Sequence, residues 1–305
     1  MRTCVIFNPT ARGDKAERFR ESLARLARDC VVKPTTGPGT APALAQEAVR
    51  EGCDCVIAAG GDGTVSEVAH GIGSSEGGLD RVRVGVIPLG TINVFARELR
   101  LPLALGPAWE TARGQAETRV DLPYAVWGTG PERRRRWFVQ LAGAGLDSRA
   151  IERVEWKWKK SVGPLAYVAA GFRAMRGPQP VIHVESGTTQ SAGALVLIGN
   201  GRYYGGEVPM FPGANLRDGL LEVRVFPRVS TALLVRFGVA WLLRRPLPGG
   251  PPPLWQADRL TLRSAADLPF EVDGDNAGRL PVEFGVLPRA LRVAVPAGSP
   301  AEWIC

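Results

Sequence analysis

The sequence lacks the cysteine and histidine patterns that metal-held and disulfide-rich proteins need. No two cysteines are spaced as Cys-x-x-Cys, and the 305 residues include only two histidines, His70 and His183. The five cysteines are an odd number and lie mostly in apolar stretches, so we expect reduced thiols. A zinc-centred fold and a disulfide-stapled secreted fold are therefore excluded.

Long hydrophobic runs are also missing. The longest, residues 232–243, is interrupted by Arg236 and is too short to span a bilayer. The chain opens with a strand-like run, Thr3 to Phe7, so we expect no secretory leader. A chain of this length with 45% hydrophobic and 22% charged residues can bury two cores. Its net charge of +8 favours polyanionic partners without choosing among nucleic acid, anionic membrane and nucleotide phosphates.

One stretch combines glycine with a single carboxylate. The apolar run Cys55 to Ala59 leads into Gly60-Gly61-Asp62-Gly63-Thr64, and a helical pattern follows. Glycines let backbone amides approach a ligand, and a helix N-terminus attracts phosphate. The spacing matches neither the Walker loop nor the dinucleotide-binding motif. The sequence predicts a different nucleotide site, in which Asp62 either faces the phosphates through a cation or caps the helix.

Four strand-loop-helix units in a row predict a parallel sheet covered by helices. The expected strands are 4–7, 30–33, 55–59 and 83–87. Ligands bind at the carboxyl ends of such strands, so the polar loops should converge there. Lys15 is then either a phosphate ligand or a solvated lysine, and Thr64 and Thr91 are either hydroxyl donors or helix caps. The loops carry Asn8, Lys15, Thr35, Asp62, Thr64, Thr91 and Asn93.

The pattern changes after Leu101-Pro102 to short segments of period two, which predict an antiparallel sandwich or barrel. We place the boundary near Glu117, giving domains 1–117 and 118–305, with the last residues able to return to the first domain. Residues 148–176 and 230–245 look helical. The first of these begins with tryptophans and lysines between 155 and 160, which suits either core packing or a lipid-facing wall.

Two carboxylates stand two residues apart in Asp273-Gly274-Asp275, at the end of an expected strand. A period of two would aim both side chains the same way, and paired acids can divide the work of general base and metal orientation. A simple hairpin turn accounts for the same three residues. Both interpretations remain open on the sequence alone.

Several stretches together resemble the bacterial lipid kinases of the diacylglycerol kinase and sphingosine kinase superfamily. In the first half they are Phe7-Asn8-Pro9 with Gly13 and Lys15, Gly60 to Thr64 with Glu67, and Pro88 to Thr91 with Asn93, Phe95 and Ala96. In the second half they are Asn200 to Gly206 with Pro209, Ala214 and Asp218 to Leu220, and Asp273 to Asp275. The resemblance covers nearly the whole chain in the family's order.

The resemblance implies an ATP-binding α/β domain, a β-sandwich that supplies a lipid pocket, and a site between them that domain closure completes. It implies that Asp275 is the proton acceptor, with Asp273 beside it and Asp62 orienting metal or water. It also implies a structural Mg²⁺ held by Asn215, Asp218 and Leu220. The residues expected at the nucleotide are Asn8, Lys15, Thr35, Gly60, Gly61, Asp62, Gly63, Thr64, Val65, Ser66, Glu67, Thr91 and Asn93.

Two departures from the family pattern bear on activity. Val94 stands where the family usually has Asp, and Asp275 stands where it usually has Glu. We interpret the chain as an ATP- and Mg²⁺-dependent kinase of a diacylglycerol-like lipid. We expect it in the cytoplasm, at the anionic inner face of the membrane, without a nucleic-acid partner. The alternatives are a nucleotide- and lipid-binding protein that has lost transfer, and a kinase of a soluble acceptor such as NAD. The sequence leaves a homo-oligomer open.

Overall fold

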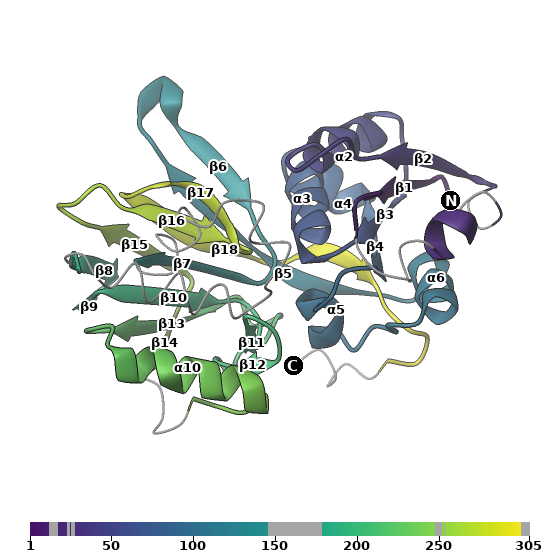
Figure 1. Cartoon of the computed structure of the whole chain (residues 1–305). Coiled ribbons are helices and arrows are strands. Elements are labelled where there is room, and N and C mark those ends of the chain that lie inside the picture. Colours follow the sequence, from purple (N-terminus) through teal and green to yellow (C-terminus); the bar gives the residue numbers. More distant parts are fainter. Residues whose placement is uncertain are drawn as a thin grey trace.

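A computed structural model describes residues 1–11, 18–22, 25, 28–145, 179–247, 252 and 254–299. Lys15, Gly13 and the tryptophan- and lysine-rich stretch between 155 and 160 lie outside these residues. The described chain forms two units side by side, a helix-covered unit from the first third of the sequence and a strand-rich unit from the rest (Figure 1). No helix among the described residues is long and apolar enough to cross a membrane.

The first unit is built on four parallel strands in the order β2-β1-β3-β4, which confirms the predicted parallel sheet. Every residue of β1, β3 and β4 is buried, as expected for a parallel sheet with both faces covered. The strands are β1 (Thr3–Phe7), β2 (Cys30–Pro34), β3 (Cys55–Gly60) and β4 (Arg83–Pro88). The helices are α2 (Ala41–Arg50), α3 (Asp62–Gly73), α4 (Gly78–Arg81), α5 (Val94–Glu98) and α6 (Leu105–Arg113).

Alternate residues of the buried strands enter two different cores. Cys4, Ile6 and Val56 pack into one cluster with α2 and α3, whereas Val5 and Ile57 pack into another with α6. Successive side chains of a strand point to opposite faces, so one apolar run feeds both layers. The arrangement fixes the strands and presents the loops that follow them at one edge of the sheet.

The second unit is an antiparallel sandwich, as the sequence predicts. Its first strand, β5 (Glu117–Trp127), is long, and β6 (Arg134–Trp137) folds back on it after a 3-10 turn at Gly130–Glu132. The further strands are β7 (Leu141–Gly145), β8 (Ile182–Ser186), β9 (Thr189–Gly193), β10 (Leu195–Gly199), β11 (Tyr203–Tyr204), β12 (Val208–Pro209), β13 (Leu221–Phe226), β14 (Leu254–Ala257), β15 (Arg259–Arg263), β16 (Pro269–Val272), β17 (Asp275–Arg279) and β18 (Val282–Ala294).

The long strands β5 and β18 join the two units into one ten-stranded sheet. β18 pairs with β5 and β15 in the second unit and runs on to pair in parallel with β4 at Arg292 and Val293. The six strands β14-β13-β10-β7-β16-β17 form a second sheet, which packs on the first through a shared core that includes Phe270 and Phe284. The helix α10 (Thr231–Leu243) covers the outer face of this second sheet, with Ser230 capping its N-terminus.

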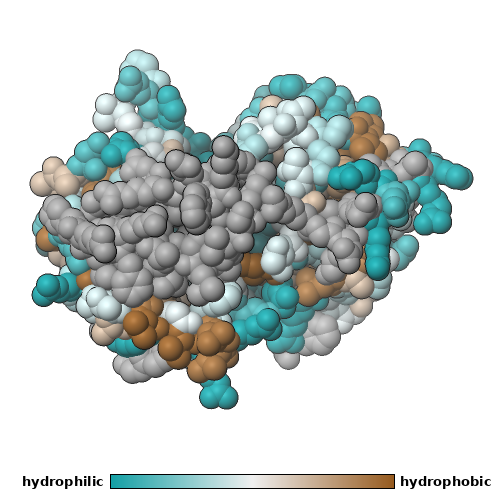
Figure 2. All heavy atoms as spheres, in the orientation of Figure 1, coloured by the Kyte–Doolittle hydropathy of each residue, from teal (hydrophilic) through white to brown (hydrophobic). Residues whose placement is uncertain are grey.

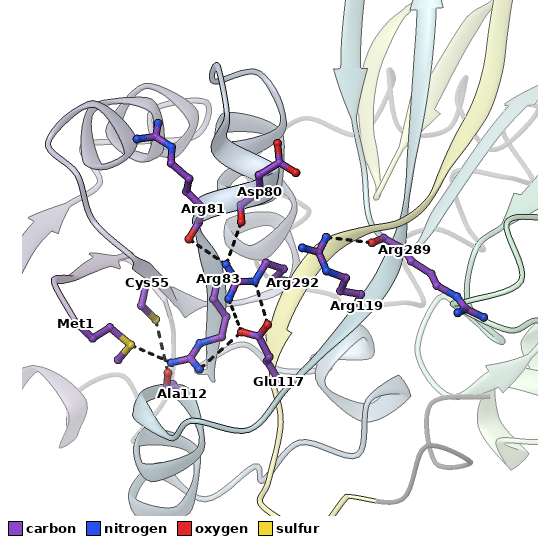
Figure 3. Close-up of polar contacts among 10 residues, drawn as sticks. All are labelled: Met1, Cys55, Asp80, Arg81, Arg83, Ala112, Glu117, Arg119, Arg289 and Arg292. Atoms are coloured by element: carbon purple, nitrogen blue, oxygen red, sulfur yellow. Dashed lines mark hydrogen bonds and ion pairs between the residues drawn. The ribbon is translucent and has the colours of Figure 1, made fainter.

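An arginine network holds the end of β18 to the first unit (Figure 3). The Arg292 guanidinium donates to both Glu117 oxygens, at 3.0 and 2.8 Å, and to the Asp80 and Arg81 carbonyls at the end of α4, at 3.1 Å each. The buried Arg83 lies 4.0 Å from the same carboxylate. One guanidinium thus joins β18, β5 and α4 with charge-assisted bonds.

We predict that Arg292→Leu lowers the free energy of unfolding by about 2 kcal/mol, because it leaves Glu117 and two carbonyls without their donor. Arg259→Leu serves as the control, since Arg259 is exposed and makes one ion pair at 3.8 Å with Glu283. Its loss should cost about 0.5 kcal/mol or less. Denaturant unfolding followed by fluorescence measures both, and equal losses would contradict a joining role for Arg292.

Candidate active site

The polar loops at the carboxyl ends of the parallel strands meet as the sequence predicts. The Asn8 side chain, after β1, donates to the Thr64 hydroxyl in α3 at 3.4 Å. The Thr35 N–H, after β2, donates to the Phe7 carbonyl at 2.8 Å. Thr35 and Thr64 are both buried. The loops after β1, β2 and β3 therefore form one continuous surface at the start of α3.

The residues Gly60 to Thr64, here called the glycine corner, span the end of β3 and the first turn of α3. Close packing requires glycine at Gly60 and at Gly90 in the loop after β4. A Cβ on Gly60 would lie 2.3 Å from the Thr64 hydroxyl, and one on Gly90 would lie 2.7 Å from the Gly61 Cα. Gly61 is the N-cap of α3 and offers no side chain to the amides of the first turn. A Cβ on the exposed Gly63 would meet nothing within 4 Å. The amides at this end of α3 are thus accessible to an anion such as phosphate.

The loop after β4 is held by its own asparagine. The Asn93 side chain accepts the Gly90 N–H at 3.0 Å and donates to the Gly90 carbonyl at 2.7 Å. Its backbone has a φ of 57°, a left-handed conformation that Asn tolerates. Asn93 is buried and Thr91 is exposed. Asn93 thus shapes the loop, and Thr91 is the residue of this pair that a ligand can reach.

Asp62 caps a helix, but it is the helix α5 and not its own. Its carboxylate accepts the Phe95 N–H at 3.1 Å and is also hydrogen-bonded by the backbone of Val94 and Asn93. Burial raises the pKa of Asp62 above its usual range, and these N–H groups oppose the rise. Asp62 therefore ties the glycine corner to the start of α5.

Asp273 lies in a hairpin turn between β16 and β17. Asp273 and Gly274 both have positive φ, 48° and 82°, so the hairpin turn is the interpretation that the structure confirms. The period-two interpretation, with two parallel carboxylates, is wrong because a left-handed turn rotates the chain between them. The Asp273 carboxylate accepts three backbone N–H groups at 2.8 to 3.0 Å. They belong to Val139, Gln140 and Leu141, just before and at the start of β7.

Asp275 has a different partner and environment. Its carboxylate is 43% exposed and pairs with Arg136 of β6 at 3.4 Å. Asp273 is fixed by backbone donors, whereas Asp275 forms an ion pair with a side chain. The two acids of the motif therefore differ in their partners and in their access to solvent.

The glycine corner and the Asp273 turn come together, although they are far apart in sequence. The negative charge of Asp273 adds to the rise in the pKa of Asp62, and the Ser66 hydroxyl of α3 lies beside the Asp273 carboxylate. Burial is the main cause that raises the pKa of Asp273 as well. Two enclosed carboxylates that repel each other are stabilised by a cation between them, so the pair fits a divalent metal ion.

No group of three or more His, Cys, Asp and Glu side chains in the described part of the chain is arranged to hold a metal unaided. Mg²⁺ is commonly held by one or two carboxylates together with phosphate oxygens and water. Asp62 and Asp273 supply the two carboxylates of such a site. The donor set therefore suits a metal that arrives with a phosphate ligand.

The expected structural metal residues lie in the loop before β13. The Asp218 carboxylate accepts the Leu220 N–H at 2.9 Å, and the Asn215 carbonyl accepts the Asp218 N–H at 3.5 Å. The Asp218 charge raises the pKa of both Asp121 and Glu222, after burial as the main cause. Glu222 is buried, and its Oε2 has no hydrogen-bond partner among the described residues. Asp218 itself is exposed, and the charge of the buried Arg224 opposes the rise in the pKa of Glu222.

Two acids support the site by accepting hydrogen bonds: Glu67, which the sequence placed at the nucleotide, and Glu98, which the sequence did not single out. Glu67 accepts the Gly39 N–H at 2.8 Å and the Ala41 N–H at 3.2 Å, so its carboxylate holds the start of α2. Glu98, the last residue of α5, is buried and accepts from the Gln140 side chain at 3.0 Å and the Tyr203 N–H at 2.8 Å. It also accepts from the Arg202 guanidinium at 3.1 Å. A lone Glu at a helix end carries no sequence signal for this role.

A half-buried histidine, His70, joins α3 to the hairpin of the second unit. The His70 Nδ1 accepts the Trp137 N–H at 3.2 Å, and a Cβ on Gly73 would lie 2.8 Å from the Trp137 ring. Burial first, and then the charge of Arg136, lowers the pKa of His70 to about 4. The histidine is therefore neutral in the folded protein at pH 7.

We predict that this histidine makes the fold acid-sensitive. The unfolded chain takes up its proton near pH 6.5 and the folded chain near pH 4, so stability is lost as the pH falls through that window. His70→Asn keeps an acceptor for Trp137 and cannot be protonated, so its melting temperature should fall less between pH 7 and pH 4.5. The exposed His183 supplies the control, His183→Asn, which should follow the wild type. An unchanged pH profile in His70→Asn would contradict the assignment.

Both units match known protein families. Residues 2–125 match the diacylglycerol kinase catalytic domain, and residues 140–295, just over half of the chain, match the YegS C-terminal NAD kinase beta sandwich-like domain. A diacylglycerol kinase of Staphylococcus aureus strain bovine RF122 / ET3-1 is 29% identical over 303 residues, which cover 97% of this chain and 92% of that protein. One from Staphylococcus haemolyticus strain JCSC1435 is 28% identical, with coverage of 97% and 89%.

Solved structures show the same fold. A diacylglycerol kinase from Bacillus anthracis str. Sterne superposes with a TM-score of 0.73 at 22% identity, over 98% of each chain. Yeast NADH kinase in complex with NADH gives a TM-score of 0.53 at 9% identity, over 98% of this chain and 84% of that one. The arrangement of an α/β unit followed by a β-sandwich is thus shared with both kinds of kinase.

Proposed function

Because the chain belongs to the diacylglycerol kinase family of lipid kinases, we propose that it transfers the γ-phosphoryl group of ATP to the hydroxyl group of diacylglycerol at an anionic membrane surface. The observation that carries the proposal is the meeting of the glycine corner with the Asp273 turn. In this proposal residues 1–117 hold ATP and the second unit holds the lipid. The site of action is the cytoplasmic face of the membrane.

In the proposed complex the triphosphate lies at the start of α3. The amides of Gly61 to Gly63 face the phosphates, with the Thr64 and Thr91 hydroxyl groups beside them. Asn8, Thr35 and Asn93 shape the surrounding loops through the contacts described above. Val65 is buried in the core and Glu67 is committed to α2, so both act by support. Lys15 keeps its proposed role as a cation facing the phosphates.

Asp62 and Asp273 would hold Mg²⁺, which neutralises the charge that develops on the transferred group when it is bound. The backbone donors fix Asp273 in orientation, which suits a positioning role. Asp275 is exposed and can move toward a lipid hydroxyl, which suits a proton acceptor. Phosphoryl transfer depends on positioning and electrostatics, and these three carboxylates account for both.

The test is transfer of labelled phosphate from ATP to vesicles that contain diacylglycerol. Asp275→Asn should lower kcat about 100-fold or more and leave ATP affinity unchanged, since it removes the proton acceptor alone. Asp62→Asn and Asp273→Asn should also weaken the Mg²⁺ dependence. Asp267→Asn is the control, because that exposed acid precedes β16 and pairs with Arg279. Wild-type protein that binds ATP and labels no lipid would refute the proposal.

The same assay addresses the alternatives. Val94 is buried at the start of α5, where its backbone N–H hydrogen-bonds to Asp62. A large gain of activity in Val94→Asp would identify a site with degraded catalysis. Labelling of NAD, with none of lipid, would identify a soluble-acceptor kinase, for which the likeness to yeast NADH kinase supplies the fold alone.

We predict that Glu98 positions Asp273 through Gln140. Gln140 donates its side-chain amide to Glu98 and its backbone N–H to Asp273, so Glu98→Gln should shift the turn relative to Asp62. A displacement on the order of 1 Å can cost ~100-fold, so kcat should fall at least tenfold with KM for ATP within about twofold. Glu110→Gln on the exposed face of α6 is the control. Equal losses in kcat and in the fraction of folded protein would reduce Glu98 to a structural role.

A further inference from the structure

The helix α10 is apolar on its outer face as well as its inner one. Leu233, Leu234 and Ala240 pack into the core beneath it. On the outer face Val235, Val239, Leu242 and Leu243 are 52%, 37%, 73% and 57% exposed. Positions i, i+4, i+7 and i+8 lie on one side of a helix, so these four form a continuous aliphatic stripe. Figure 2 shows a hydrophobic patch on the surface where Figure 1 places α10.

The charge within the segment that carries this stripe has one sign. No Asp or Glu occurs between Glu222 and Asp258, whereas the segment carries five arginines. Three of them, Arg228, Arg244 and Arg245, are exposed at the two ends of the helix, and Arg236 lies beside the stripe. An exposed aliphatic stripe bordered by arginines is the pattern of a helix that lies in the interface of an anionic membrane.

The C-terminal end of the helix lies beside the candidate active site. A Cβ on Gly206 would lie 3.5 Å from the Trp241 ring and 3.9 Å from Ile92 in the loop after β4. Glu207 accepts from Arg244 at 3.0 Å and also from Arg97 of α5. A surface that contacts the stripe at Leu242 is therefore close to the loop that carries Thr91.

We infer that the stripe of α10 docks on an anionic bilayer, with its leucines and valines at the boundary of headgroups and acyl chains and its arginines on lipid phosphates. The inference rests on the proposed lipid kinase function for its direction, because docking here brings the site loops to the surface where the lipid substrate lies. A second copy of the chain fits less well. Two such faces together would oppose arginines to arginines, with no acidic residue in the segment to pair with them.

The test is co-sedimentation of the full chain with vesicles of phosphatidylglycerol and phosphatidylcholine at low salt. The double variant Leu242→Ser/Leu243→Ser should lower the partition coefficient about tenfold, because two exposed apolar side chains leave the interface. Arg245→Gln should lower it about fivefold on anionic vesicles and leave it unchanged on pure phosphatidylcholine. Val181→Ser is the matched control, since Val181 is 51% exposed just before β8, away from α10. Unchanged partition of the double variant would overturn the inference.

Kinase assays separate this inference from the proposed function. The double variant should phosphorylate dispersed short-chain diacylglycerol at the wild-type rate and lose about tenfold on vesicles. Equal loss on both substrates would overturn the docking role, whereas vesicle binding without any lipid phosphorylation would refute the proposed function alone. Light scattering measures the oligomeric state of the wild type and the double variant, and circular dichroism checks that both are folded. A wild-type dimer that the double variant dissociates, with equal vesicle binding, would assign the stripe to self-association.

Discussion

The five-residue helix α5 sets the relative position of the two units because a carboxylate accepts hydrogen bonds at each of its ends. Asp62 of the first unit accepts N–H groups at its start, and Glu98 at its end accepts from Gln140, Arg202 and Tyr203 of the second. Gln140 in turn holds Asp273 through its backbone. The distance between Asp62 and Asp273 is thus fixed through α5 and Gln140. Burial is the main cause that raises the pKa of both carboxylates, and the negative charge of Asp273 adds to the rise at Asp62.

The sequence was sufficient for the parts in which local pattern and tertiary structure agree. The buried runs at Thr3–Phe7 and Cys55–Gly60 predict parallel strands, and the loops after them converge as such sheets require. It left two interpretations open where a single backbone angle decides the outcome. The left-handed conformation of Asp273 separates its direction from that of Asp275, and no period-two rule anticipates it. Glu98 was missed because its partners are 42 to 105 residues away along the chain. A glutamate at the end of a helix is usually exposed to solvent, so its position gives no sign of these contacts.

The two units share one sheet, which bears on the expectation that they close on each other. The sequence suggested a hinge between catalytic acids on separate domains, whereas β5 and β18 pair along most of their length and cross between the units. A change in the angle between the units has to bend this ladder, and the register shift between Leu287 and Leu291 is an irregularity already present along it.

The path of β18 also has a consequence for biosynthesis. The edge of β4 acquires its neighbour only when residues near 292 have left the ribosome, long after the rest of the nucleotide-binding unit has been made. Until then an open strand edge is exposed to other chains. The nascent first unit thus keeps this strand edge unpaired until β18 has been made, and a fragment that ends near residue 117 would keep it permanently.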